Sequence, residues 1–211
     1  MATNENERQC ALVTGASAGI GQELARVLAA NKFNLVLLAR SRDKLQELAN
    51  ELSAAHSVRT TIVPADLSEP GAAQAVFQAV GDAGTQIDLL VNNAGLLMEG
   101  RFNALDLDKQ LQLLQVNIVA MTAMTHLFLA PMLERKRGRI LNVASIASFM
   151  PVPNLAVYAA SKAYVRSFGD ALYQELSGSG ITVTTLCPGV TDTGMVQGTD
   201  LGSVPSVMIM D

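Results

Sequence analysis

Three side chains in the second half of the sequence could together move a proton. Tyr158 and Lys162 are four positions apart, so on a helix they lie on one face and within reach of each other. A nearby ammonium favours the phenolate and lowers the tyrosine pKa from its usual value of about 10. Ser145 follows a strand-like run, and its hydroxyl can hydrogen-bond a carbonyl oxygen. The set predicts acid–base catalysis at a carbonyl or an alcohol, with a chance surface helix as the alternative.

A glycine-rich turn near the start of the sequence could bind a dinucleotide. Residues 14–21 read TGASAGIG, between a strand-like run and a helical pattern. Gly15 permits a tight turn, Gly19 lets the backbone approach a pyrophosphate, and Gly21 lets the helix pack closely on the sheet. The free N–H groups at the start of that helix favour phosphate. Dinucleotide binding is therefore expected in place of the simpler alternative, a plain strand-to-helix turn.

The residues after the second strand-like run indicate which dinucleotide is bound. Sites for NAD carry an acidic residue that binds the ribose 2′-hydroxyl. Here the corresponding position is Ala39, and Arg40 and Arg42 follow it. Guanidinium groups grip a 2′-phosphate through paired hydrogen bonds, whereas cations at a helix start are otherwise unfavourable. We therefore expect NADP(H), with NAD(H) less favoured and two solvated arginines as the alternative.

Strand-like runs alternate with helical patterns along the whole sequence. Ser41 and Ser68 are expected to cap two of the helices. Apolar strands separated by helices indicate a parallel sheet that is covered on both faces. We expect one α/β domain over residues 1–211, a doubly wound sheet of strand order 3-2-1-4-5-6, with ligands at the carboxyl ends of the strands. The expected strands are Ala11–Thr14, Leu35–Ala39, Thr60–Val63, Ile87–Val91, Arg139–Val143 and Ile181–Leu186.

Composition and charge exclude several classes of function. A net charge of −4 argues against binding to a nucleic acid backbone. Cys10 and Cys187 form no metal-like cluster and, with a polar first segment, indicate a cytoplasmic protein. The apolar stretch Leu113–Leu133 contains several polar residues and a proline, so we expect a buried helix and no membrane span.

Taken in order, these motifs resemble the short-chain dehydrogenase/reductase family, from about Gln9 to Thr193. Besides the glycine turn, the similar segments are Asp66-Leu67, the NNAG of residues 92–95, Asn117 within QVNIVA, and Pro188-Gly189-Val190 with Thr193. The resemblance implies a catalytic tetrad of Asn117, Ser145, Tyr158 and Lys162 and no metal. The cofactor contacts expected from the residues and the resemblance are Gly15, Ser17, Gly19, Ile20, Gly21, Arg40, Arg42, Asp66, Leu67, Asn93, Ala94, Gly95, Tyr158, Lys162, Pro188, Gly189, Val190 and Thr193.

The resemblance also implies a mechanism for interconverting a carbonyl and a secondary alcohol. NADPH would deliver a hydride to the carbonyl carbon while Ser145 holds the oxygen and Tyr158 donates the proton. Lys162 would lower the tyrosine pKa and bind the ribose, and Asn117 would hold a water molecule. The expected pocket segments, 96–98, 146–155 and the residues from Met195 onward, are mostly apolar, which favours an apolar ketone or aldehyde such as a lipid-like, steroid-like or β-ketoacyl compound. A non-catalytic NADP-binding scaffold and, less favoured, a sugar-nucleotide epimerase are the alternatives.

Two further expectations concern the end of the chain and its assembly. Members of the family continue with another helix and a seventh strand, so residues 194–211 read as an incomplete substrate lid. We expect the sequence to be a fragment, with a partner chain that covers the last strand as the alternative. A homodimer or homotetramer is expected on the helix from Asp106 to Leu133 and the helix that carries Tyr158. Its expected apolar surface consists of Leu114, Ile118, Met121, Met124 and Leu127.

Overall fold

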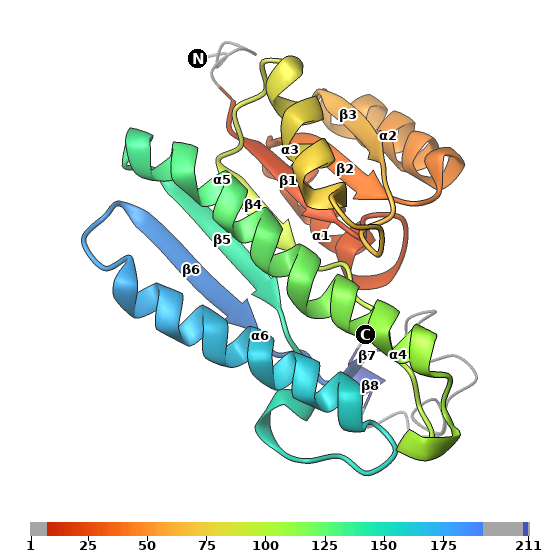
Figure 1. Ribbon diagram of the computed structural model, residues 1–211. Helices are drawn as coiled ribbons and strands as arrows, with labels where there is room; N and C mark the ends of the chain where they lie inside the picture. Colours follow the sequence, from red (N-terminus) through yellow and green to blue (C-terminus); the bar gives the residue numbers. More distant parts are fainter. Residues whose placement is uncertain (1–7, 192–208, 211) are drawn as a thin grey trace.

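The computed structural model describes residues 8–191 and 209–210 (Figure 1). Its main feature is a six-stranded parallel sheet in the order β3-β2-β1-β4-β5-β6, which confirms the expected strand order. The strands are β1 (Cys10–Thr14), β2 (Asn34–Ala39), β3 (Thr60–Pro64), β4 (Leu89–Asn92), β5 (Gly138–Val143) and β6 (Ile181–Leu186).

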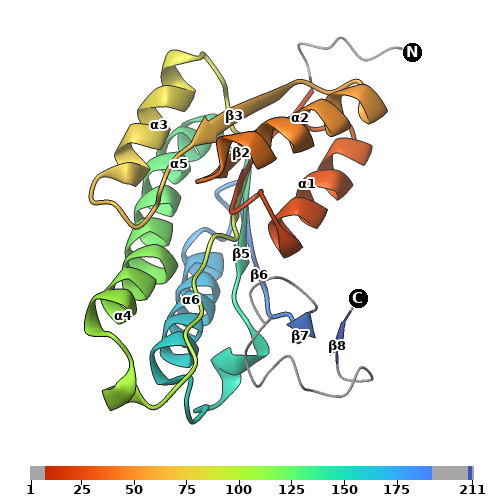
Figure 2. The same cartoon turned by 90° about the vertical axis from the view of Figure 1, so that its right-hand side faces the viewer.

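Helices cover both faces of this sheet, as Figure 2 shows. Helices α1 and α2 lie on one face, and α3, α5 and α6 lie on the other. The helices are α1 (Gly19–Ala30), α2 (Arg42–His56), α3 (Ala72–Asp82), α4 (Leu107–Leu114), α5 (Met121–Arg135) and α6 (Ala156–Glu175), with short helical turns η2 (Phe102–Ala104), η3 (Gln115–Ala120) and η4 (Ile146–Phe149).

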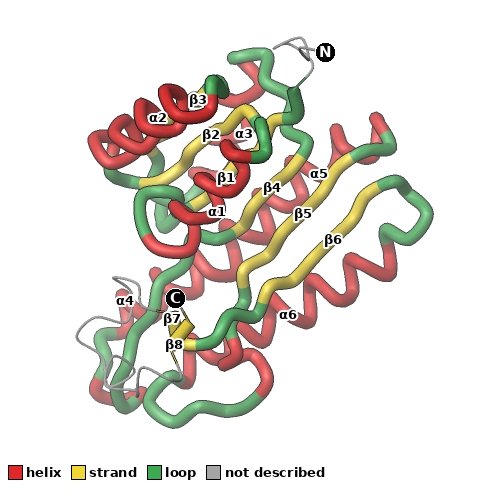
Figure 3. Tube along the Cα trace, turned by 180° about the vertical axis from the view of Figure 1, so that it is seen from behind, coloured by secondary structure: helices red, strands yellow, loops and turns green. Residues whose placement is uncertain are grey.

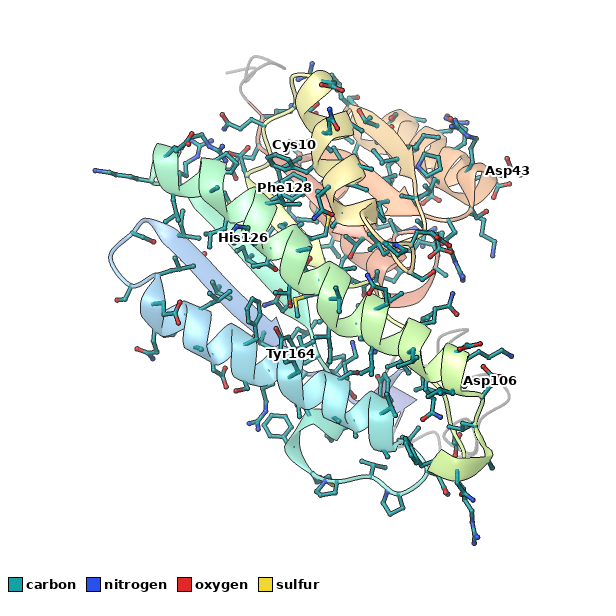
Figure 4. All side chains as sticks on the ribbon, in the orientation of Figure 1. Cys10, Asp43, Asp106, His126, Phe128 and Tyr164 are labelled. Carbon is teal, nitrogen blue, oxygen red and sulfur yellow. The ribbon has the colours of Figure 1, made fainter. Side chains whose placement is uncertain are left out.

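Alternate residues of each strand are buried on opposite faces of the sheet. On the α1/α2 face, Val13 and Leu37 pack against Leu45 and Leu48 of α2. On the other face, the core includes Phe128 of α5, which Figure 4 labels and which meets Phe77 of α3 edge-on at 5.1 Å between ring centroids. Burial on both faces explains why these strands are almost continuously apolar, as parallel sheets require.

The α1/α2 face is not covered along its whole width. Figure 3 shows β5 and β6 from this side, and within the described residues no helix lies over them. The side chains of Thr182 and Thr184 on β6 are exposed there. The expected lid at residues 194–211 lies outside the described residues except for β8 (Ile209–Met210), which pairs in parallel with β7 (Val190–Thr191).

The long apolar helix expected around Leu113–Leu133 is present and is interrupted. Residues 107–135 form α4, a π-helical turn at η3, and α5. By length and composition alone this stretch could cross a membrane, but here its buried residues pack against α3 and the sheet. Met121 and Met124, which we expected on an oligomer surface, are 7% and 0% exposed within one chain. That part of the expectation is wrong, because the sheet covers Met124, and Met121 packs against Val165 and Phe168 of α6.

Of the two expected helix caps, one is present and the other is not. Ser41 caps α2, since its hydroxyl accepts a hydrogen bond from the Lys44 backbone N–H. Ser68 does not cap α3, because the chain continues through a turn to Gly71, the N-cap residue, at a φ of +80°. Both the N–H and the hydroxyl of Ser68 donate to Asp66 Oδ1. The serine therefore orders the loop after β3 and leaves the helix uncapped by a side chain.

Candidate active site

A groove of about 630 Å³ runs along the carboxyl ends of the strands. The turns after β1, β2, β3, β4 and β5, the first turns of α6 and the segment after β6 all contribute to it. The doubly wound topology explains the position, because parallel strands bring their following loops to one edge. The expected residues that line the groove are Gly15, Ser17, Gly19, Ile20, Arg40, Asp66, Leu67, Asn93, Ala94, Gly95, Ser145, Tyr158, Lys162, Pro188 and Gly189.

The glycine turn after β1 is built so that only glycine fits at two positions. Gly15 has a φ of +68°, and a Cβ at this position would lie 2.8 Å from Asn93 Nδ2. Gly21 does not line the groove, but a Cβ on it would lie 2.4 Å from the Gly15 carbonyl oxygen. Gly21 therefore supports the turn by close packing, and the structure does not place it at the groove surface, where we expected a direct cofactor contact.

The turn is held rigidly to the end of the neighbouring strand β4. The hydroxyl of Thr14 donates to the Val91 carbonyl and accepts from the backbone N–H groups of Asn93 and Ala94. Asn93 Nδ2 in turn donates to the Thr14 carbonyl. These bonds tie the two loops that form the floor of the groove into one unit.

The first turn of α1 is suited to an anion. Its N-cap residue, Ala18, offers no side-chain acceptor, and the first turn contains no acidic residue. The N–H groups at this end therefore keep their capacity to bind phosphate, and the helix dipole adds favourable potential. With a glycine cradle and uncapped N–H groups in one groove, the residues fit a dinucleotide.

The far end of the groove is basic, with one arginine fewer than expected. Arg40 and Ser41 line it, and so does Lys44, whereas Arg42 does not. Arg42 is the first residue of α2, directly after the capping residue Ser41. Lys44 was missed by the sequence analysis, and its position three residues after the cap is the signal that could have found it, since residues at that spacing share a face.

An acidic side chain from the loop after β3 faces this basic end. Asp66 Oδ2 lies 3.9 Å from Arg40 Nη1, in an ion pair whose arginine is exposed and whose aspartate is half-buried. Burial alone would raise the pKa of the Asp66 carboxyl, but the hydrogen bonds from Ser68 and the charge of Arg40 hold it below its usual value. The carboxylate is therefore ionised and partly orients Arg40.

The proton-transfer residues meet in the middle of the groove. Ser145 follows β5, and α6 carries Tyr158 and Lys162, which are only 8% and 5% exposed. Lys162 Nζ donates to the Val143 carbonyl at 2.8 Å and lies 5.8 Å from the centroid of the Tyr158 ring. The three side chains expected to do chemistry are thus brought together at the floor of one groove.

The pKa values of the buried pair differ from the expectation in one respect. Burial lowers the pKa of Lys162 from 10.5 to about 8. Burial raises the pKa of Tyr158, and the Ser145 hydroxyl opposes this rise. The expected lowering of the tyrosine pKa is therefore not found, because burial outweighs the groups that favour the phenolate, and the Lys162 ammonium donates its hydrogen bond to the Val143 carbonyl.

Asn117, the fourth expected tetrad residue, lies beside the groove and does not line it. It sits in the π-helical turn η3 and is 2% exposed. Its Oδ1 accepts from the Leu96 N–H at 2.8 Å, and its Nδ2 donates to the Leu96 carbonyl at 3.0 Å and to Ser161 Oγ at 3.0 Å. The amide side chain is thus bound to protein groups, and the water-holding role expected for Asn117 stays a prediction.

The remaining expected residues follow β6. Pro188 and Gly189 line the groove, and the Pro188 carbonyl accepts from the Ile146 N–H, which joins this segment to the turn that carries Ser145. Val190 begins β7, and Thr193 lies outside the described residues. In the part of the chain that the structure describes, no three His, Cys, Asp or Glu side chains are grouped as a metal site would require.

The groove end beside Tyr158 is apolar. Met98, expected in this pocket, packs nearby but does not line it. The lining side chains at this end are Leu96, Leu97, Val116, Ile146, Ala147, Met150, Val152 and Leu155.

The sheet order and the groove define a Rossmann-fold protein, and comparison with known proteins gives its family. A profile of the short chain dehydrogenases matches residues 9–202. A solved short-chain dehydrogenase from Sphingobium yanoikuyae in complex with NADPH superposes with a TM-score of 0.89 at 32% identity, covering 95% of this chain and 79% of that one. The chain belongs to the short-chain dehydrogenase/reductase family of oxidoreductases.

Two curated relatives show how far the similarity extends. The chain is 38% identical over 190 residues to hydroxysteroid dehydrogenase-like protein 1 of Gallus gallus, which covers 89% of this chain and 57% of the relative. It is 37% identical over 189 residues to ketoacyl reductase HetN of a Nostoc species, which covers 89% of this chain and 66% of the relative. The chain therefore spans less than two thirds of the length of these relatives.

Proposed function

We propose that the protein is an NADP(H)-dependent oxidoreductase that interconverts an apolar ketone or aldehyde and its alcohol. The observation that carries this proposal is that Ser145, Tyr158 and Lys162 share one groove with the glycine turn. The basic end formed by Arg40 and Lys44 supports NADP(H) over NAD(H), as does the NADPH in the Sphingobium structure. The two free cysteines, Cys10 and Cys187, fit a reducing compartment, and we place the protein in the cytoplasm.

Each side chain in the groove has a role that its chemistry allows. NADPH, when bound, supplies the hydride that reduces the carbonyl carbon. Ser145 donates a hydrogen bond to the carbonyl oxygen, and Tyr158 donates the proton that completes the alcohol. Lys162 keeps a positive charge near the phenol and favours the phenolate that remains. In the reverse reaction the phenolate accepts the proton from the alcohol.

The apolar wall beside Tyr158 indicates the substrate class. Apart from Ser145, Tyr158 and Lys162, the side chains that line this end carry no polar atom, so a charged acid or a sugar would lose hydrogen bonds to water without replacing them. An apolar ketone, including a β-ketoacyl thioester, loses few hydrogen bonds to water when its apolar part enters this end of the groove. The ketoacyl reductase among the relatives supports this class.

The proposal is tested with a panel of carbonyl compounds and the purified chain. NADPH oxidation is followed with a 3-oxoacyl thioester, a steroid ketone, an aliphatic ketone and a ketose. Reduction of the first three in preference to the ketose is expected. NADPH binding without turnover of any compound would instead identify a non-catalytic NADP-binding protein.

Replacing Arg40 tests the cofactor preference. Arg40→Ala is expected to weaken NADPH binding by about 1–3 kcal/mol, the scale of a charge-assisted hydrogen bond, and to leave NADH binding unchanged. Arg42→Ala is the matched control, because this arginine is two residues further along, at the start of α2, and does not line the groove. Calorimetric titration with both cofactors measures the difference. Equal affinity of the unmodified chain for NADPH and NADH would contradict the assignment.

The face formed by α5 and α6 is proposed as a homodimer contact. Tyr164 reaches from α6 toward α5 on the side turned to the reader in Figure 4, and its hydroxyl lies 2.9 Å from that of Thr122. Val119, one turn before Thr122, is 51% exposed. Val119→Asp is expected to shift the chain toward monomer in sedimentation velocity, because a charge is costly in a symmetric apolar contact. Val27→Asp, on α1, is the control, and a monomeric unmodified chain would disprove the contact.

A further inference from the structure

Ser161 is a fully buried hydroxyl within the catalytic helix, between Tyr158 and Lys162. It does not line the groove, and the chemistry proposed above gives it no part. We propose that Ser161 is a positioning residue that fixes the orientation of the Asn117 amide and, through it, the wall of the groove at Leu96. The inference rests on the proposed oxidoreductase function for its kinetic consequence, but its geometric basis is independent of that function.

The hydroxyl of Ser161 has one proton, and that proton is already used. Ser161 Oγ donates to the Tyr158 carbonyl at 2.7 Å, within the same helix. The hydroxyl can therefore only accept from its second neighbour, Asn117, whose Nδ2 lies 3.0 Å away. A side-chain amide has an oxygen end and an NH2 end of almost the same shape, and Ser161 accepts only the NH2 end.

This selection determines how Asn117 meets the groove wall. With Nδ2 turned to Ser161, the amide offers Oδ1 to the Leu96 N–H and Nδ2 to the Leu96 carbonyl, so both backbone groups are satisfied. Reversing the amide would place its NH2 against the Leu96 N–H and its oxygen against the Leu96 carbonyl. Two repulsive contacts would replace two hydrogen bonds. The Ser161 hydroxyl and the Leu96 backbone therefore favour the same orientation of the Asn117 amide.

The amide that Ser161 orients lies next to the catalytic lysine. A Cβ added to Gly95 would lie 3.3 Å from Asn117 Oδ1 and 3.4 Å from Lys162 Nζ, so the two groups flank this glycine closely. Gly95 and Leu96 both line the groove. A tilt of the Asn117 amide would therefore move the backbone that packs against the Lys162 ammonium.

The helix that carries Asn117 needs such an anchor from outside. Residues 115–120 form a π-helical turn between α4 and α5, which departs from regular α-helical hydrogen bonding. Figure 1 shows α6 running alongside α5 and α4, so Ser161 connects the irregular turn to the straight catalytic helix. The bond holds the irregular turn in register with Tyr158 and Lys162.

The competing explanation is that Ser161 is only a small residue that allows two helices to pack closely. The two explanations differ for Ser161→Ala, which keeps the small volume and removes the hydroxyl. Ser167→Ala is the matched control, since Ser167 is an exposed serine of the same helix. Ser161→Thr restores the hydroxyl and serves as the rescue variant.

The first readout is amide hydrogen exchange of Leu96, measured by NMR on the full chain. Because Asn117 Oδ1 accepts from the Leu96 N–H, Ser161→Ala is expected to speed exchange at Leu96 by about tenfold, the factor that corresponds to losing about 1.4 kcal/mol of protection. Ser161→Thr and Ser167→Ala are expected to exchange as the unmodified chain does. Unchanged exchange at Leu96 in Ser161→Ala would overturn the proposal. This readout needs no substrate, so it stands even if no carbonyl compound is turned over.

The second readout is steady-state kinetics with the best ketone of the panel. Ser161→Ala is expected to lower kcat by about 10- to 100-fold, the scale of a small misplacement of reacting groups, with the KM for NADPH little changed. Combining it with Asn117→Ala should add nothing to the loss caused by Asn117→Ala alone, because both act through one amide. Additive losses, or a kcat equal to that of the Ser167→Ala control, would show that Ser161 only fills space. If Ser161→Ala does not fold, Ser161→Cys, which weakens both hydrogen bonds at similar volume, takes its place.

Discussion

Replacing Tyr158 by Phe is expected to abolish turnover while NADPH still binds. The substitution removes one oxygen atom and keeps the ring, which is 8% exposed and packs with Leu113 and Leu155. The fold and the apolar wall should therefore survive, and only the proton donor is lost. General acid catalysis by a positioned side chain contributes a factor of about 10² to 10⁴, and kcat should fall by at least this much. NADPH binding, measured by calorimetry, should change by no more than about tenfold, because a lost neutral hydrogen bond is worth only about 0.5–1.5 kcal/mol.

The control for this prediction lies on the same helix. Tyr173 is 58% exposed near the end of α6, and Tyr173→Phe should leave both kcat and NADPH binding unchanged. Near-normal turnover by Tyr158→Phe would mean that another group donates the proton. In that case the groove binds NADP(H) but the acid–base assignment made from Tyr158 and Lys162 is wrong.

The sheet was predictable because its strands are buried on both faces. Val36 and Leu37 face opposite sides and are each 1% or less exposed, so the strand reads as one apolar run with helices before and after it. Such runs leave little choice of topology, since right-handed crossovers then fix the order of the strands. The glycine turn was equally clear, because Gly15 and Gly21 occupy positions where a Cβ would overlap neighbouring atoms.

Local details that depend on three-dimensional packing were not predictable in the same way. Ser68 has the residue type of a helix cap, but Asp66 two positions earlier accepts both of its donors and the helix starts later. Arg42 was expected beside Arg40, yet it is the first residue of α2 and does not line the groove, whereas Lys44 does. Both results depend on which hydrogen bonds Ser68 and Ser41 form in the folded chain, and sequence spacing alone does not show these bonds.

The electrostatics of the site depend still more on packing. The sequence shows that Lys162 lies near Tyr158, but not that its ammonium points to the Val143 carbonyl. It also cannot show that both groups are almost fully buried, which moves the two pKa values in the directions that disfavour charge. The π-helical turn at Asn117 is a third example, because it is stabilised by Leu96 and Ser161, which are distant in sequence.

Replacing Lys162 by Ala is expected to impair both turnover and NADPH binding, because the side chain supplies the only cation among the described residues that line the Tyr158 end of the groove. We expect kcat to fall by about 10²-fold or more, since the charge that favours the phenolate is lost. Affinity for NADPH should fall by about 10- to 100-fold, the worth of one hydrogen bond to a charged group. Lys109→Ala, at an exposed position of α4, is the control and should change neither quantity.

The same substitution gives a pH-dependent change in stability whose sign follows from burial. The Lys162 pKa is about 8 in the folded chain and 10.5 when the group is unperturbed, so between these values the unfolded chain binds more protons than the folded one. Stability rises with pH wherever the unfolded state binds more protons, and below about pH 8 the cost of burying the ammonium is present in full. The unmodified chain should therefore gain free energy of unfolding relative to Lys162→Ala as the pH rises from about 8 to 10.5. Tyr158 is present in both chains, so its own titration cancels to first order. Urea denaturation of the two chains across this range measures the difference, and a difference that stays constant with pH would mean that Lys162 is not charged and buried as the structure places it.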